Sequence, residues 1–234
     1  MTPDMIMAII LSLVQPTIDT IKENSKSYQR HLIKIKEQAK LLADETMENK
    51  STIPQEYIQE PNDSIVLPAL QTSIYYLNED NIRTLFAKLL ASAFDCRKSE
   101  SLHPGFIEII KQLSHMDVRI LCYLHDSPNF NGISAIKNNQ EYLLIETSLI
   151  KNIEDVDQIS FSIENLIRLR LIHVDRRCDI SFEDENSDVV VVSTSSKLDE
   201  KSNFYKLLCK EYSLRKVNAY LTVFGKNFLK VCVD

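Results

Sequence analysis

The sequence predicts a mainly α-helical protein in which an N-terminal helical bundle precedes a C-terminal winged-helix-like α/β module. Apolar residues recur at helical spacing through the first half of the chain, whereas the clearest strand-like runs lie in the C-terminal third. We divide the chain into a long amphipathic helical segment (1–53), a helical bundle core (54–126), a connecting segment (127–155) and a winged-helix-like module (156–234).

Residues 3–50 are expected to be helical, with a kink or break at Pro16. Thr2, Pro3 and Asp4 form a helix start, because they supply a capping hydroxyl, a proline at the first helical position and an early acid. Pro3 is therefore expected to be the first helical residue.

The apolar run over 5–14 is too short to cross a bilayer, which takes about 20 residues. No basic residue precedes it, so it is not a typical secretory signal. We expect it to pack on the body of the protein, with peripheral membrane contact or self-association as alternatives.

A nearly heptad apolar seam follows over 21–42, carried by Ile21, Tyr28, Leu32, Ile35, Ala39 and Leu42. The seam covers only about three heptads. We therefore favour docking within the chain over self-association through 21–42.

The bundle core is clearest over 85–94, where the sequence is apolar on nearly every face of a helix. A helix of this kind is surrounded by protein. We expect one helix over 64–77, with Pro68 near its first turn, and a second that Asn78 caps and that runs to about Arg97.

Two shorter helices are expected next. His103 and Pro104 open the first, and Ser114 caps the second, with Asp117 completing a capping box. Because the connections are short, the helices should form an antiparallel bundle.

The connecting segment carries weak signals. Pro128, Asn131-Gly132 and Asn138-Asn139 suggest loops, and periodicity does not decide between helix and strand over 141–150.

In the last segment, Ser160 or Ser162 is expected to cap a helix that leads into a strand over 171–174. Thr222 is expected to cap the closing helix. Further elements are a strand over 188–193, an acidic turn over 183–186 and a helix over 201–212.

Composition excludes several classes of function. The net charge of −6 argues against a generally basic nucleic-acid binder. With three glycines and neither GxGxxG nor GxxxxGK[ST], the chain has no glycine-rich nucleotide loop. Five scattered cysteines without a CxxC pair are typical of the reducing cytoplasm, where we expect the protein.

Four arginines, Arg168, Arg170, Arg176 and Arg177, cluster at the predicted helix-to-strand junction and are candidates for nucleic-acid or partner contact. Acidic and basic residues are equal in number over 156–234, and carboxylates gather over 183–188. This balance favours a protein partner over nucleic acid.

Metal and catalytic sites are not expected. His115, Cys122 and His125 share one helix face, with Cys122 read as a buried thiol, but no fourth zinc ligand is evident. His103 is expected to shape a helix start, and Asp95 has no evident role beyond solvent exposure. We predict no cofactor, no metal and no enzyme activity.

Residues 80–83 and 89–93, followed by 103–114, resemble the Abi-alpha family of bacterial proteins, named for abortive infection, a form of phage resistance. The ending over 221–228 resembles that family's close, so the likeness spans roughly 55–234. The resemblance implies a defence role and supplies no catalytic motif.

The order of helix, strand, long hairpin and LTxxG before a last helix also looks like a winged helix, in which Thr222 and Gly225 would shape the turn. We expect a non-enzymatic phage-defence accessory or sensor that acts through macromolecular contacts. The alternatives are a winged-helix nucleic-acid-binding transcription regulator and an oligomerising structural subunit.

Overall fold

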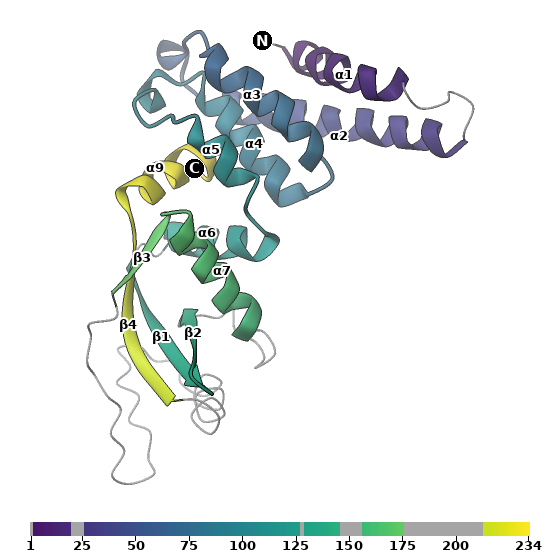
Figure 1. Cartoon of the computed structure of the whole chain (residues 1–234). Coiled ribbons are helices and arrows are strands. Elements are labelled where there is room, and N and C mark those ends of the chain that lie inside the picture. The colour runs from purple at the N-terminus through teal and green to yellow at the C-terminus, as the bar shows by residue number, and fades with distance from the viewer. Residues whose placement is uncertain (1, 20–25, 127–128, 146–155, 176–212) are drawn as a thin grey trace, which may run out of the picture. The chain divides into compact units, whose positions relative to one another are not determined.

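A computed structural model describes residues 2–19, 26–126, 129–145, 156–175 and 213–234 (Figure 1). The chain divides into two compact units. Unit 1 comprises Met1–Val118 with Lys226–Asp234, and unit 2 comprises Arg119–Gly225.

Unit 1 is built from helices. They are α1 (Pro3–Asp19), α2 (Lys26–Ser51), α3 (Asp63–Ser73), α4 (Asp80–Ser92) and α5 (Gly105–Ile110), with the 3-10 turns η1 (Gln55–Tyr57), η2 (Ile74–Tyr76) and η3 (Cys96–Lys98). Helix α6 (His115–Asp126) starts in this unit, and α9 (Val223–Cys232) ends in it.

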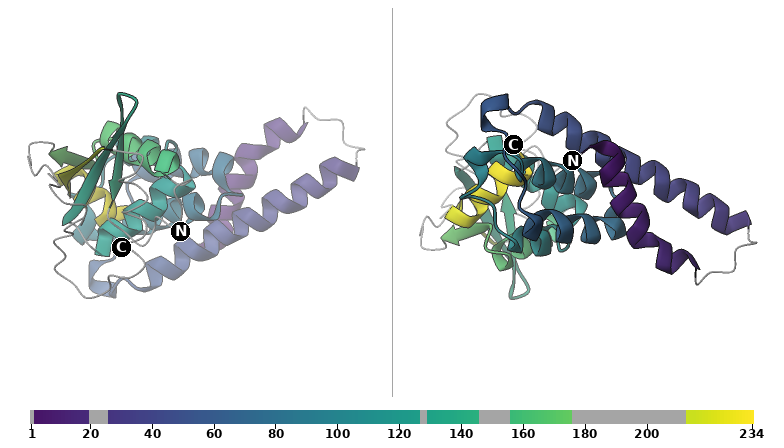
Figure 2. Two further views of the ribbon diagram at one scale, coloured as in Figure 1. Left: turned by 90° about the horizontal axis from the view of Figure 1, so that it is seen from below. Right: turned by 90° about the horizontal axis from the view of Figure 1, so that it is seen from above.

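Helix α1 begins as predicted, because the amide of Met5 donates to Thr2 Oγ1 at 3.3 Å. Ile6 and Ile10 are fully buried where α1 packs against α2 and α3, whereas Met5 and Leu13 are exposed. The views in Figure 2 show α1 beside α2. In the described part of the chain, no helix is both long enough and apolar enough to traverse a membrane.

Of the kink or break predicted at Pro16, the break is wrong, because Pro16 lies within α1, which continues to Asp19. Residues 20–25, between the two helices, lie outside the described part of the chain. The C-terminal half of the seam is covered by the protein itself: Ala39 and Leu42 are fully buried on α2, which packs against α1 and α4. The side chains of Ile21, Tyr28 and Leu32 are outside the described residues.

Helix α4 carries the core of unit 1, as predicted. Every residue over 85–94 except Lys88 is buried. The predicted bounds were wrong at both ends: α4 starts at Asp80 behind Glu79 instead of at an Asn78 cap, and it ends at Ser92 instead of near Arg97.

Helix α3 starts at Asp63, where the side chain of Asn62 accepts from Ser64 N at 2.9 Å, and Pro68 lies inside it. Helix α5 packs into the unit through Phe106, whose ring meets Phe228 of α9 edge to face at 5.3 Å.

The predicted capping box at the start of α6 is confirmed. Ser114 N donates to the Asp117 carboxylate at 2.7 Å, and Asp117 N donates to Ser114 Oγ at 3.2 Å. These reciprocal bonds satisfy two amides that no helical carbonyl can reach.

Unit 2 contains a four-stranded antiparallel sheet in the order β2-β1-β4-β3. Its strands are β1 (Asn129–Lys137), β2 (Gln140–Ile145), β3 (Ile172–Asp175) and β4 (Ser213–Leu221), and α7 (Val156–Arg168) packs on β2 and β3 (Figure 1). The segment 127–155, expected to be a connection, thus supplies half of the sheet.

The loop expected at Asn131-Gly132 is wrong, because both residues pair with β2 or β4 inside β1. The loop expected at Asn138-Asn139 is confirmed and is a turn that joins β1 to β2. Both asparagines have positive φ, 52° and 61°, as a two-residue hairpin turn requires.

Neither Ser160 nor Ser162 caps α7, because the helix starts earlier, at Val156. Both serines are buried inside it. Ser160 Oγ instead accepts from Leu143 N at 3.0 Å, which gives an amide of the edge strand β2 a partner outside the sheet.

The strand expected over 171–174 is confirmed as β3, which pairs with β4 from Ile172–Leu221 to Asp175–Asn218. Thr222 caps α9 as predicted, since Gly225 N donates to its Oγ1 at 2.8 Å. The elements expected over 183–186, 188–193 and 201–212 lie outside the described part of the chain.

Candidate functional site

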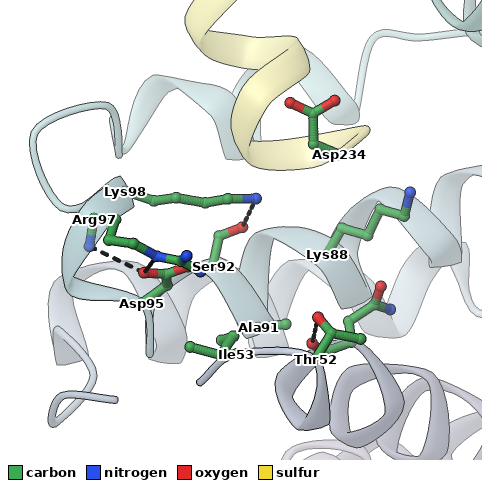
Figure 3. A pocket seen from close by; sticks show the side chains of 10 residues that line it. Thr52, Ile53, Lys88, Ala91, Ser92, Asp95, Arg97, Lys98 and Asp234 are labelled. Atoms are coloured by element: carbon green, nitrogen blue, oxygen red, sulfur yellow. Dashed lines mark hydrogen bonds and ion pairs between the residues drawn. The ribbon is translucent and has the colours of Figure 1, made fainter. Parts of the chain in front are cut away.

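A polar pocket of about 190 Å³ lies within unit 1, where the end of α2, one face of α4, the η3 turn and the end of α9 meet (Figure 3). Its lining residues are Asn49, Thr52, Ile53, Lys88, Ala91, Ser92, Asp95, Arg97, Lys98 and Asp234.

Asp95 forms one wall of this pocket. Its side chain is 2% exposed and accepts two bonds from Arg97, from Nε at 2.9 Å and from Nη2 at 2.7 Å. It also accepts from Arg97 N at 3.0 Å and so caps η3. The expectation that Asp95 is exposed to solvent without a structural role was therefore wrong.

The ion pair sets the charge state of Asp95. The side-chain bonds from Arg97 hold the pKa of Asp95 below its ordinary value, although burial opposes this. The Arg97 guanidinium also lies over the Tyr57 ring of η1, 4.5 Å from its centroid. Asp95 is thus an ionised carboxylate with a fixed partner.

Lys88, Ser92 and Lys98 face the end of α9. Ser92 Oγ donates to the carbonyl of Val231 at 2.8 Å, and the Lys88 ammonium donates to the carbonyl of Val233. The Lys98 ammonium donates to Ser92 Oγ at 3.3 Å. Burial lowers the pKa of Lys98, against the raising effect of the nearby Asp234 charge. These bonds suit the last turn of a helix, whose carbonyls lack helical partners.

The pocket contains charged groups of both signs. Its functional groups are two ammonium groups, a guanidinium, two hydroxyls, an amide and the carboxylates of Asp95 and Asp234, and none of its lining residues is a histidine. The Ser92 hydroxyl, the one hydroxyl on α4 in the pocket, already donates to a carbonyl. The arrangement therefore favours electrostatic binding over nucleophilic chemistry.

A second polar cluster, which sequence analysis missed, is centred on Arg83 of α4. Its side chain is 7% exposed and is bonded to Glu45 of α2 at 2.9 Å and to Asp80 at 2.7 Å. Gln38 Oε1 and the carbonyl of Leu77 accept further bonds, at 2.8 and 3.1 Å.

Burial alone would lower the pKa of Arg83, but its bonds to Asp80 and Glu45 raise it. The cluster fastens α2 to α4. The one signal in the sequence was an arginine within a helix otherwise expected to be buried.

The structure describes two of the four arginines that were predicted to contact nucleic acid or a partner. Arg168 and Arg170 are exposed at the junction of α7 and β3. Arg168 donates from Nη2 to Asn165 Oδ1 at 2.7 Å, and Arg170 has a φ of 61°. Arg176 and Arg177 lie outside the described residues.

The residues weighed for metal binding are His115, Cys122 and His125, all exposed on α6. Cys122 had been expected to be buried, which is wrong. The His115 ring is hydrogen-bonded to the Asn81 amide group. Across the described ranges no three metal-binding side chains come together. His103 acts as predicted, because its Nδ1 accepts from Gly105 N at 3.0 Å at the start of α5.

Comparison with known proteins decides the family. The sequence pattern of the family described as abortive infection alpha matches residues 27–232. The chain belongs to this family. The match extends the resemblance seen in the sequence toward the N-terminus, to include α2.

One solved structure is similar to the chain, that of an uncharacterised protein from the hydrocarbon-degrading marine bacterium Alcanivorax borkumensis SK2. The two are 12% identical, over 59% of this chain and 96% of the other, with a TM-score of 0.32. No curated protein matches the chain.

Proposed function

We propose that this protein is a non-enzymatic accessory or sensor of bacterial phage defence that acts in the cytoplasm through contacts with a protein partner. The observation that carries the proposal is the match to the abortive infection alpha family over 27–232. The family suggests a role in phage defence, and the surface chemistry supports the mode of action.

The polar side chains that might have served catalysis are held in structural roles. Asp95 pairs with Arg97, His103 caps α5, and Arg83 joins α2 to α4. General acids, bases and nucleophiles need access to a reacting group, which the buried Asp95 and Arg83 lack. His103 is exposed, but its Nδ1 already accepts a bond from Gly105 N. This supports binding as the mode of action.

Each unit exposes large apolar side chains that a partner could cover. In unit 2 Phe161 of α7 is 70% exposed, and in unit 1 Tyr75 of η2 is 82% exposed. Exposed aromatic residues are frequent anchors of protein interfaces. Phe161 and Tyr75 are therefore the first residues to test.

The role is tested by plating a broad panel of phages on isogenic cells with and without the protein. We expect fewer plaques with the protein for at least one phage. Phe161→Ser should reduce this protection, whereas Gln158→Ser, also exposed on α7, should not. Equal plating by all phages would remove the proposal, and full protection by Phe161→Ser and Tyr75→Ser would exclude these anchors.

The second candidate, a winged-helix nucleic-acid-binding regulator, is supported by the exposure of Arg168 and Arg170 at one junction. A gel shift with random duplex at low salt tests it, because phosphate contacts are strongest there. Binding that weakens with salt and is lost in the double variant Arg168→Glu, Arg170→Glu would support a nucleic-acid-binding function. Absence of any shift would remove it.

The third candidate, a subunit that oligomerises through 21–42, has less support because Ala39 and Leu42 are covered within the chain. Light scattering tests it with Leu32→Lys, a substitution at a seam position before the buried half. An unchanged mass would exclude this contact.

A further inference from the structure

We propose that the unit 1 pocket binds a small phosphate-type anion, either inorganic phosphate or a phosphomonoester, through the ammonium groups of Lys88 and Lys98. The site is independent of the role in defence proposed above.

Two lysines line the pocket. Both reach the pocket from neighbouring elements, Lys88 from α4 and Lys98 from η3. Figure 3 shows their side chains extending over the same face of α4, toward the turn that carries Asp234. The ammonium groups of Lys88 and Lys98 repel each other, and this repulsion contributes to the lowered pKa of Lys98.

Some of the charged side chains in the pocket are paired with each other. The pocket is lined by three cationic side chains, Lys88, Arg97 and Lys98, and by the carboxylates of Asp95 and Asp234. Arg97 and Asp95 neutralise each other in their ion pair at 2.7 Å. The two lysines take no part in this ion pair, and the charge of Asp234 lies near Lys98.

The protein satisfies the two ammonium groups with neutral acceptors. Lys88 donates to the carbonyl of Val233 and Lys98 to the hydroxyl of Ser92. Among the described residues neither lysine has a carboxylate within 4.0 Å. A partly buried ammonium without an ion pair loses hydration and gains little in return. An anion within reach of both lysines would give each ammonium group a charged acceptor.

The size of the pocket limits the ligand. Its volume, about 190 Å³, is below the roughly 300 Å³ at which pockets for drug-sized ligands begin. A phosphate group with at most a small organic part is therefore favoured over a dinucleotide. Ammonium groups suit this ligand because they bind phosphate as point charges and tolerate several orientations.

The test is titration of the full chain with inorganic phosphate and with glycerol phosphate, followed by calorimetry and phosphorus NMR at constant ionic strength. Lys98→Gln and Lys88→Gln should each weaken binding by roughly tenfold or more, since each removes one charged hydrogen bond. Lys98→Arg keeps the charge and should retain binding. Tighter binding of glycerol phosphate than of phosphate would assign the site to a phosphomonoester.

The matched control is Lys111→Gln, which removes an exposed lysine paired with Glu108 on the same unit. It should bind both ligands like the wild type. Circular dichroism checks that each variant is folded. Absence of binding by the wild type at millimolar ligand, or equal binding by the wild type and by folded Lys98→Gln, would overturn the proposal.

Discussion

Gly225 rests directly on the main chain of Leu171, and a Cβ atom on residue 225 would lie 1.9 Å from the Leu171 carbonyl oxygen. This contact sets the first turn of α9 against the chain just before β3. Thr222 stabilises the same contact, because its amide donates to the Leu171 carbonyl at 3.1 Å and its hydroxyl donates to the Arg170 carbonyl at 2.5 Å. The glycine of the LTxxG pattern therefore serves close approach, and its φ is not positive.

Gly225→Ala is expected to destabilise the protein by about 3 kcal/mol. The new Cβ atom and the Leu171 carbonyl group are both fixed to the main chain, so neither can rotate out of the clash. Urea denaturation followed by circular dichroism measures this. Gly105→Ala is the matched control: its Cβ would meet only the side chain of His103, at 2.8 Å, which can rotate away at the cost of one hydrogen bond to residue 105 N. Equal losses in the two variants would contradict the argument.

Arg170→Gly is expected to stabilise unit 2 by about 0.5–1 kcal/mol. Arg170 ends α7 in the left-handed region, with a φ of 61°, and its amide donates to the Ile167 carbonyl while that of Leu171 donates to Leu166. This pattern of helix end favours glycine. Arg168→Gly, at the last helical residue, should instead lower the midpoint of thermal unfolding.

Arg83→Leu is expected to cost about 3 kcal/mol, because it removes the guanidinium donors to Glu45 and Gln38 and leaves Glu45 with the weaker bond from the Thr84 hydroxyl of α4. A double-mutant cycle with Glu45→Gln, measured by urea denaturation, should give a coupling energy above about 1 kcal/mol. The exposed pair Glu108–Lys111 is the control and should couple by less than about 0.5 kcal/mol. Additive effects at Arg83 and Glu45 would exclude the proposed link.

Asp95→Asn is expected to destabilise the protein by roughly 1–3 kcal/mol at neutral pH, since it weakens the cap of η3 and the bond to Arg97. Because Arg97 lowers the pKa of the folded Asp95 carboxyl, its contribution is complete above the unfolded pKa of about 3.9 and is lost as pH falls through the folded pKa. The difference between wild type and variant should therefore shrink below about pH 4. A difference independent of pH would show that the charge is irrelevant.

Local interactions made part of the fold predictable. The apolar helix over 85–94 and the Ser114–Asp117 capping box depend on residues within a few positions of each other, and both are confirmed. Thr222 as the cap of α9 was predictable for the same reason.

The missed features depend on distant residues. Strand β1 is paired along its length with β4, more than 75 residues later in the chain, and the short polar stretch around Asn131 gave no local sign of this. The partner of Arg83 is Glu45, on another helix. The pocket depends on the contact between α9 and the face of α4 that carries Ser92. There the carbonyl of Val231 accepts a hydrogen bond from the Ser92 hydroxyl. No spacing within either helix indicates that contact.

The two ends of α9 belong to different units, and this determines the order in which the units can be completed during translation. Phe228 and Val231 are fully buried components of unit 1, yet they follow every residue of unit 2 in the chain. During translation the N-terminal helices leave the ribosome first and still lack a piece of their interior until the last helix has been made. The first-made unit is therefore the last to be completed, and a polypeptide stopped before residue 226 exposes the apolar surface that Phe228 covers.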